Sequence, residues 1–330
     1  MQSYRFNQSP LRVYGVPFYA ESGRLERVPE ALREKMPSLR DLGRRTPGAR
    51  VEFRTDSPRF TVSVTLSSLG VDIGMSIYAC QSVNVMVGPR GNPRFAGLVY
   101  PTGYGERSFS RTFVKSAEME DITLLLPRNE PIEGLEIAIE DGARIEAPTP
   151  YRHAPMVFYG SSITEGGCCA SANSAYTQIL SRRLDADYIN MGFSGSARGE
   201  LEMADYLSAL PMSVLVYDYD HNAPDADWLA RTHEAFFLRI RANRPTLPVV
   251  MLTRPDFDFD PASPARREVI RRTFENARAS GDENVYFIDG ETLFGVEERQ
   301  FCTVDGCHPN DLGFYRMAAA IEPVLRKILK

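Results

Sequence analysis

The sequence predicts an α/β protein in which an antiparallel β-sandwich precedes a parallel sheet covered by helices. Residues 50–140 form short runs in which polar and apolar side chains alternate, as in strands with one buried face. The second half alternates short apolar runs with amphipathic segments, as in βα units. The two patterns meet in the proline-containing stretch 142–154. We therefore predict two domains, residues 1–150 and 151–330.

Composition narrows the class of protein. The chain has 330 residues, a net charge of −5 and five scattered cysteines. Neither half is strongly basic, so no nucleic-acid partner is expected. No apolar run is long enough to span a membrane, and the N-terminus lacks a basic and apolar leader. We therefore expect a cytoplasmic protein with reduced thiols and no membrane partner.

The first half is dominated by predicted strands. Alternating runs broken by Gly, Pro and Asn predict strands at 50–55, 59–66, 74–80, 82–87, 121–126 and 134–140. One segment differs, because residues 28–36 resemble a short helix with a proline in its first turn.

The second half predicts a parallel sheet. Apolar runs predict strands at 156–159, 188–191, 214–217, 249–252 and 285–288. Helices are predicted near 173–185, 198–209, 225–243, 263–280 and 310–329. Ligands of such sheets bind beyond the carboxyl ends of the strands, so chemistry is expected in the segments that follow each strand.

Small and polar residues follow the first two strands of this sheet. The first is followed by Gly160 and a pair of serines, Ser161 and Ser162. No phosphate-binding glycine motif or GxSxG elbow is present. A serine here either caps the next helix or, given partners, acts as a nucleophile. Gly195, after the second strand, either serves the turn or offers its N–H to an oxyanion.

The segment after the third strand carries Asp218, Asp220 and Asn222. This spacing matches the start of a calcium loop, but Ala223 and Leu229 stand where that loop needs glycine and glutamate. No metal is therefore expected. The Asn222 side chain could instead donate its amide to an oxyanion.

The chain has four histidines, which allows a catalytic base to be sought by elimination. His153 lies in the stretch between the domains, and His233 shares a helical face with apolar residues and is expected in the core. His221 adjoins Asn222, but it has no carboxylate at a comparable fixed spacing on a turn that starts a helix. His308 follows Asp305 by three residues, so that the carboxylate can fix its tautomer. His308 is the best candidate base.

These residues resemble a known family. The segment from Gly160 to Thr164, then Gly195, Asn222 and the pair Asp305 and His308, resemble the four blocks of the SGNH (GDSL-like) esterases and acyl hydrolases in order and spacing. Residues 74–78, Gly-Met-Ser-Ile-Tyr, are similar to the Gly-x-Asp-Leu-Tyr signature of the β-domain that precedes this hydrolase in a two-domain bacterial type. The resemblance implies a flavodoxin-like three-layer α/β/α domain with a five-stranded sheet, after a jelly-roll-like β-sandwich.

The resemblance also implies roles for individual residues. Ser162 would be the nucleophile, His308 the base, and Asp305 the residue that orients it. The N–H groups of Ser162 and Gly195 and the side chain of Asn222 would form the oxyanion hole. Two positions depart from the family pattern: Ser161 replaces an aspartate, and the usual Gly-x-Asn-Asp block reads Asp-His-Asn-Ala at 220–223, so Asn222 could be misaligned by one residue.

We therefore expect a serine esterase that hydrolyses short-chain acyl esters, acetyl esters above all, of a carbohydrate or similar polar alcohol. An acyltransferase using the same acyl-enzyme is one alternative, and a catalytically inactive sugar-binding protein is another. Glu165, His221 and Arg254 follow predicted strands and are expected to contact substrate. The reaction needs no cofactor. The expected partner is a small-molecule ester, an acylated carbohydrate, and the chain could form a homo-oligomer.

Overall fold

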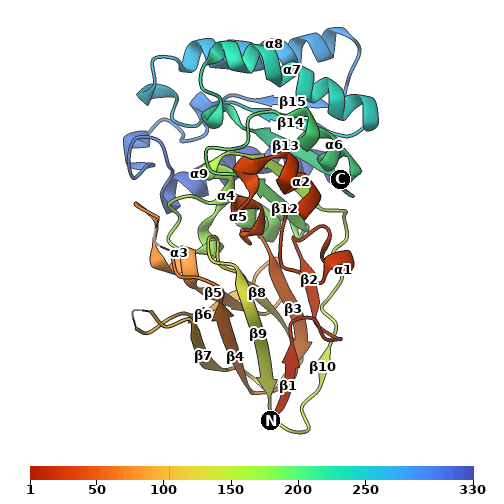
Figure 1. Ribbon diagram of the computed structural model, residues 1–330, viewed down its shortest axis with the longest axis vertical. Coiled ribbons are helices and arrows are strands. Elements are labelled where there is room, and N and C mark those ends of the chain that lie inside the picture. Colours follow the sequence, from red (N-terminus) through yellow and green to blue (C-terminus); the bar gives the residue numbers. More distant parts are fainter. Residues whose placement is uncertain (71, 104) are drawn as a thin grey trace.

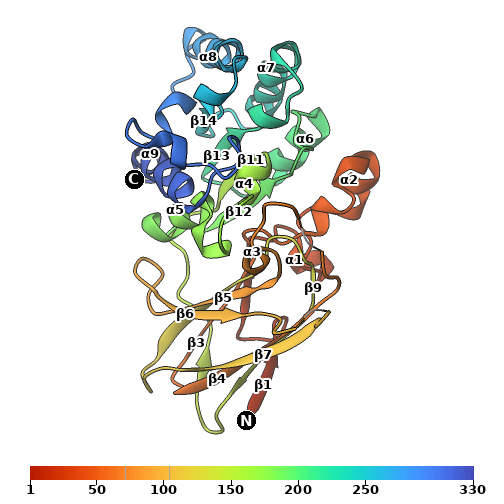
Figure 2. The same cartoon turned by 90° about the vertical axis from the view of Figure 1, so that its left-hand side faces the viewer.

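The computed structural model describes residues 1–70, 72–103 and 105–330. A β-rich region and an α/β region lie end to end, with the N-terminus at the far end of the β-rich region (Figure 1). Turning the molecule by 90° keeps the two regions apart along the long axis (Figure 2).

The α/β region contains one parallel sheet. Its strands are β11 (Met156–Gly160), β12 (Tyr188–Gly192), β13 (Val214–Asp218), β14 (Val249–Leu252) and β15 (Val285–Ile288). They lie in the order β12-β11-β13-β14-β15, and every neighbouring pair is parallel. This is the flavodoxin-like order, in which the sheet changes direction beside the first strand. The predicted fold class is confirmed.

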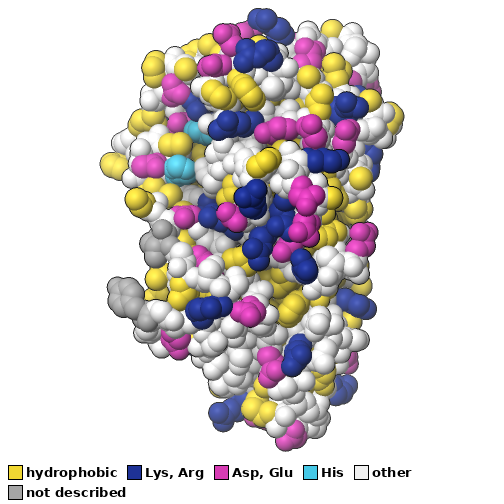
Figure 3. Space-filling model, viewed as in Figure 1, with side chains coloured by type: hydrophobic (Ala, Val, Ile, Leu, Met, Phe, Trp, Pro, Cys, Tyr) yellow, Lys and Arg dark blue, Asp and Glu magenta, His cyan; other side chains and the backbone are white. Residues whose placement is uncertain are grey.

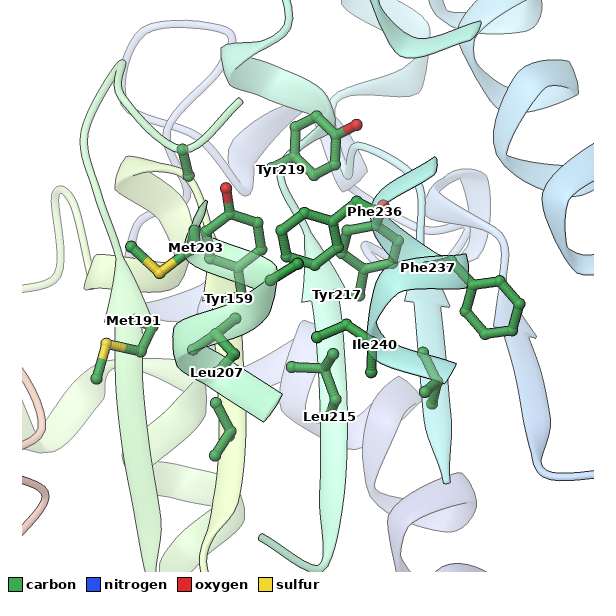
Figure 4. Close-up of a cluster of buried hydrophobic side chains, with 14 of the residues drawn as sticks. Tyr159, Met191, Met203, Leu207, Leu215, Tyr217, Tyr219, Phe236, Phe237 and Ile240 are labelled. Atoms are coloured by element: carbon green, nitrogen blue, oxygen red, sulfur yellow. The ribbon is translucent and has the colours of Figure 1, made fainter. Parts of the chain in front are cut away.

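Helices cover both faces of this sheet. They are α4 (Ser162–Glu165), α5 (Tyr176–Leu184), α6 (Leu201–Ala209), α7 (Ala226–Asn243), α8 (Ser263–Ala279) and α9 (Asp311–Ile328). Buried side chains of α6, α7 and α8 share a cluster with Tyr159, Tyr217 and Phe236 (Figure 4). Those of α5 and α9 share a second cluster with Phe158. Successive side chains of β11 therefore point to opposite faces.

Two antiparallel sheets form the β-rich region. One has the order β1-β9-β4-β7, and the other has the order β10-β3-β8-β5-β6 with β2 beside β3. Their bounds are β1 Gln2–Arg5, β2 Arg12–Tyr14, β3 Arg50–Thr55, β4 Arg59–Leu66, β5 Val83–Val87, β6 Arg94–Val99, β7 Ser108–Val114, β8 Glu120–Leu125, β9 Ile132–Ile139 and β10 Ile145–Glu146. Inward-facing residues of both sheets form one core, as in a sandwich.

Some predicted elements of the first half are wrong. The run 74–80 is not a strand, because α3 (Ile77–Gln81) begins after Ser76, whose hydroxyl accepts a hydrogen bond from the Tyr78 N–H. This is a helix cap, and it outweighs the alternation of apolar residues. Strand β7 was not predicted, because in its interior only Phe109 and Phe113 are buried, which gives a spacing of four rather than two.

Part of the first half packs against the α/β region. Helix α2 (Glu30–Lys35) falls within the predicted helix 28–36, and α1 (Tyr19–Ser22) precedes it. Val28, Leu32 and Leu39 join the apolar cluster of α6 and α7. A cut at residue 150 would therefore strip part of that core, and the division into 1–150 and 151–330 stays a prediction.

No helix among the described residues is long and apolar enough to cross a membrane.

Candidate active site

The sheet brings three of the polar segments to one edge. Gly160, the last residue of β11, pairs with Gly192 of β12 on one side and with Asp218 of β13 on the other. The segments that follow these three strands therefore all begin at the same edge of the sheet, side by side. Gly160 is required there, because a Cβ atom would lie 2.2 Å from the Asp218 carbonyl oxygen.

The two serines after β11 have different surroundings. Ser161 is buried, and its Oγ accepts a hydrogen bond of 3.2 Å from the Ile163 N–H, so it caps α4. Ser162 is the first residue of α4, and its Oγ lies 2.9 Å from His308 Nε2. The Ser162 N–H finds no hydrogen-bond acceptor within the described chain. Ser162 is thus the serine with a base beside it.

His308 is held by a tight turn before α9. Asp305 Oδ1 accepts hydrogen bonds from the His308 N–H at 2.7 Å and the Cys307 N–H at 3.0 Å. Asp305 Oδ2 lies 2.8 Å from His308 Nδ1. Since the ionised carboxylate can only accept, Nδ1 carries the proton and the Nε2 lone pair faces Ser162. The three side chains form a continuous chain of hydrogen bonds.

Asp305 is ionised in this arrangement. Burial alone would raise the pKa of Asp305, but hydrogen bonds from the His308 ring and from the backbone lower it below its ordinary value. The carboxylate can then fix the His308 tautomer and stabilise the imidazolium that forms when the ring takes a proton.

Gly195 and Asn222 lie together, but they are bonded to each other and to the backbone. The Gly195 N–H donates to Asn222 Oδ1 at 3.1 Å, and Asn222 Nδ2 donates to the Phe193 carbonyl at 2.9 Å. In this arrangement the Gly195 N–H is occupied, and one of the two N–H donors of the Asn222 amide is engaged with the backbone. For the Gly195 N–H to hold an oxyanion, that oxyanion must replace Asn222 Oδ1 as its acceptor.

Glu165 is not a rim residue, and the structure corrects its prediction as a substrate contact. Its side chain is completely buried. Arg128 Nη2 donates to Glu165 Oε2 at 3.0 Å, and Arg27 Nη2 lies 3.6 Å from Oε1. Both arginines belong to the first half of the chain, so burial against them removes Glu165 from the surface of the site.

His221 and Arg254 also turn inward. Each side chain is only 7% exposed. Arg254 pairs with Asp260 and donates from Nη2 to His221 Nδ1 at 3.2 Å. His221 Nε2 lies 2.9 Å from Asp256 Oδ1. The structure does not support either residue as a direct substrate contact.

His221, Asp256 and Cys307 place potential metal-ligating atoms within 4.8 Å of one another. Arg254 adjoins the same atoms, with Nε 3.5 Å from Asp256 Oδ1. A guanidinium is always charged, so it opposes a second cation at this point. Burial also raises the pKa of the Cys307 thiol to about 12, which disfavours the thiolate that binds a metal. Cys307 Sγ lies 3.6 Å from His221 Nδ1, so the group is better explained as a support for the loop that carries His308.

A further buried carboxyl lies beneath the nucleophile turn. Asp218 accepts a hydrogen bond of 3.4 Å from the Thr164 hydroxyl. Burial, with a smaller contribution from neighbouring Asp220, raises the pKa of Asp218 well above its ordinary value. Burial therefore favours the neutral form of Asp218 over the carboxylate.

Sequence reasoning missed the residues that the first half contributes to this region. Arg27 and Arg128 surround Glu165, and Met75 Sδ lies 2.7 Å from the Cys168 backbone nitrogen, close to the nucleophile turn. Both arginines stand in segments without helical or strand periodicity. No local signal distinguishes them from the chain's other arginines.

With the geometry established, comparisons with known proteins decide the family. Residues 153–326, more than half of the chain, match the family model described as GDSL-like lipase/acylhydrolase. The chain belongs to the GDSL-like lipase/acylhydrolase family. Residues 2–145 match a second model, the N-terminus of SGNH hydrolase-type esterases. The predicted family and the predicted class, a carboxylic ester hydrolase, are confirmed.

Solved structures share the fold of this acylhydrolase over most or all of the chain. A Bacteroides ovatus protein described as a GDSL-like lipase has a TM-score of 0.88 and 26% identity, covering 99% of this chain and 98% of that one. A salicylyl-acyltransferase from a tetracycline biosynthetic pathway has a TM-score of 0.82 and 20% identity, covering 99% and 97%. A family two carbohydrate esterase from Clostridium thermocellum, solved with cellohexaose, has a TM-score of 0.62 and 17% identity, covering 86% and 93%. At 20% and 17% identity, the similarity of the last two structures to this chain shows a shared fold only. No curated protein matches the sequence significantly.

Proposed function

We propose that this acylhydrolase is a serine esterase that removes short acyl groups, acetyl above all, from a carbohydrate or a similar polar alcohol. The observation that carries the proposal is the hydrogen-bonded chain from Ser162 through His308 to Asp305, with distances of 2.9 and 2.8 Å. A serine hydroxyl is a weak nucleophile at neutral pH and needs a base at this distance.

The proposed reaction proceeds in two steps. His308 Nε2 takes the Ser162 proton as Oγ attacks the ester carbonyl, and the imidazolium then gives that proton to the departing alcohol. The products of this step are an acyl-Ser162 ester and the free alcohol. Water, deprotonated by His308, attacks the acyl-enzyme in the second step and releases the carboxylic acid and the free serine. Asp305 holds the ring in the required tautomer throughout.

The proposed oxyanion hole begins with the Ser162 N–H, which is free of internal acceptors among the described residues. The N–H of Gly195 and the amide of Asn222 join it when the oxyanion replaces Asn222 Oδ1 as the acceptor. In sites of this kind the loss of one donor costs about 3–4 kcal/mol of transition-state stabilisation.

The surroundings of the site favour a hydroxylated substrate. The loop after Phe193 carries the exposed residues Gly195 and Arg198, and Arg198 Nε donates to the Gly195 carbonyl at 3.2 Å. Asp305 is also exposed at the rim. Polar groups of this kind orient a sugar better than they solvate a long acyl chain.

The proposal is tested with p-nitrophenyl esters of increasing chain length and with acetylated mono- and oligosaccharides. We expect the highest kcat/KM on acetyl esters, a steep fall by about eight carbons as the polar rim fails to solvate the chain, and release of free acetate. A preference for long-chain esters would contradict the proposed substrate class.

Acyl transfer is the second candidate, because the salicylyl-acyltransferase shares both domains of the fold over nearly its entire length. The two reactions share the acyl-enzyme and differ in the acceptor. The same assay repeated with a sugar alcohol distinguishes them. A transferred acetyl ester in place of free acetate would favour the acyltransferase.

A further inference from the structure

A buried group of charges joins the β-rich domain to the proposed site. Glu165 stands at its centre, and Arg27 and Arg128 approach from the first half of the chain. The side chains of Glu165 and Arg27 are fully buried, and that of Arg128 is 5% exposed. Basic and acidic side chains also gather on the surface where the two domains meet (Figure 3).

Glu165 connects the two parts of the site that must be held at a fixed separation. It is the last residue of α4, the helical turn that begins with Ser162. Its Oε2 accepts hydrogen bonds from both the N–H, at 3.2 Å, and the hydroxyl of Ser194. Ser194 immediately precedes Gly195. Glu165 therefore ties the nucleophile turn to the loop of the proposed oxyanion donor.

Arg128 forms hydrogen bonds with both Glu165 and Ser194. Its Nη2 donates to Ser194 Oγ at 2.8 Å and to Glu165 Oε2 at 3.0 Å. Its Nη1 donates to Asn129 Oδ1 and to Asp72 Oδ2, both in the β-rich domain. The planar guanidinium offers its donors in a fixed fork, so it sets distances as well as charge.

Arg27 holds the other side of the same loop. Its Nη1 donates to the carbonyls of Asn190 and Gly192, each at 2.8 Å, and its guanidinium carbon lies 4.7 Å from the centre of the Phe193 ring. Residues 190–194 are thus fixed by two arginines of the first domain. Within its own domain the loop is held by the Phe193 N–H, which donates to the Gly160 carbonyl at 2.9 Å, and by the bonds from Asn222 and Glu165.

The two arginines remain charged. Burial lowers the pKa of Arg27 to about 10, which still leaves its guanidinium protonated at neutral pH. Burial would also lower the pKa of Arg128, but the Glu165 carboxylate outweighs it and the pKa is raised. A buried carboxylate without such partners would be strongly destabilised.

We propose that Arg128 is a positioning residue for catalysis: through Ser194 and Glu165 it sets the place of Gly195 relative to Ser162. The β-rich domain is then part of the catalytic apparatus. This inference rests on the proposed function, because it assigns Gly195 to the oxyanion hole. A displacement of about 1 Å at such a group can reduce turnover by about 10²-fold.

The chain offers a matched control for a substitution that only weakens the contact between the two domains. Arg50 is another buried arginine of the β-rich domain, and it pairs with Asp187, just before β12. Arg128 acts at the opposite end of that strand, beyond Gly192. Replacing Arg50 disturbs the contact between the domains without touching the loop of Gly195.

The experiment compares Arg128→Ala, Ser194→Ala, the double variant and Arg50→Ala with the wild type. Active sites are counted by fluorophosphonate titration, so that unfolded protein does not enter kcat. We expect Arg128→Ala to lower kcat about 10²-fold with little change in KM. Ser194→Ala, which loses a hydrogen bond to a charged group, should lower kcat about 10-fold. The Arg50→Ala variant should retain wild-type kcat per titrated site and lose thermal stability.

The double variant makes the test decisive. If Arg128 acts through Ser194, removing both side chains should lower kcat no more than Arg128→Ala alone, because neighbours that share one contact are not additive. Full additivity, or wild-type kcat in Arg128→Ala, would overturn the inference while leaving the esterase proposal intact. A wild type that hydrolyses no ester would instead contradict the proposed function. Should Arg128→Ala fail to fold, Ser194→Ala with wild-type kcat overturns the inference by itself.

Discussion

Asn222 shows how one side chain can serve two states of a site. Its amide accepts from the Gly195 N–H and donates to the Phe193 carbonyl. An oxyanion would take over the acceptor role, and the asparagine would then donate to it. An amide suits this exchange because it carries both kinds of group on one side chain.

Replacing Asn222 by alanine should therefore lower kcat by about 10²–10³ and leave KM nearly unchanged, since the donated bond forms in the transition state. Steady-state kinetics on a short acyl ester measure both constants. His221→Ala is the matched neighbour and should reduce kcat less, because that ring faces Asp256 rather than Ser162. A reversed order of the two variants would show that the third sequence block is misaligned.

At the scale of elements, α7 and α8 enclose a histidine that the sequence predicts to be a core residue. The structure confirms this, because His233 is 2% exposed and its Nδ1 lies 2.9 Å from Thr273 Oγ1 of α8. Its ring stacks on Tyr217, with centroids 4.3 Å apart. Burial lowers the pKa of His233 to about 3.

This burial predicts a pH dependence of stability. The unfolded chain binds a proton at His233 below its ordinary pKa of 6.5, whereas the folded chain does so only near 3. Between these values the unfolded state holds the extra proton, so the free energy of unfolding falls as the pH falls, by up to about 1.4 kcal/mol per pH unit. In His233→Asn this contribution should vanish. Urea unfolding of both proteins at several pH values measures it, and parallel curves would refute the assignment.

The parallel sheet was predictable because short apolar runs, such as 214–217 and 249–252, alternate with longer amphipathic segments. The bond between Asp305 and His308 was predictable from their spacing of three residues, whereas Ser162 was chosen over Ser161 by its position in the family block. Helix α3 was not predictable from periodicity, because Ser76 caps it locally. The arginines around Glu165 were missed for a different reason: Arg128 lies 37 positions from Glu165 in the chain, and only the packing of two domains brings them together.

At the scale of the whole molecule, the contact between the domains contributes buried residues to the apolar core of the α/β region. Residues of the 28–39 segment pack on α6 and α7, and the Arg50 and Arg128 pairs join the two regions elsewhere. Removing one partner of a buried ion pair typically costs about 3–5 kcal/mol. The molecule should therefore fold as one cooperative unit.

The fragment 151–330 should accordingly be insoluble or inactive when expressed without the first domain, because Glu165 and Asp187 would lose their buried arginine partners. Solubility, circular dichroism and ester hydrolysis of the fragment test this. A fragment with full activity would show that the first domain is dispensable, and it would also exclude a positioning role for Arg128.

The central claim is that Ser162, and not its neighbour, carries the acyl group. Fluorophosphonate labelling followed by peptide mass spectrometry of the wild type, Ser161→Ala and Ser162→Ala tests it most directly. We predict one adduct, on Ser162, in the wild type and in Ser161→Ala, and none in a folded Ser162→Ala protein. An adduct on Ser161, or labelling that survives in Ser162→Ala, would contradict the account.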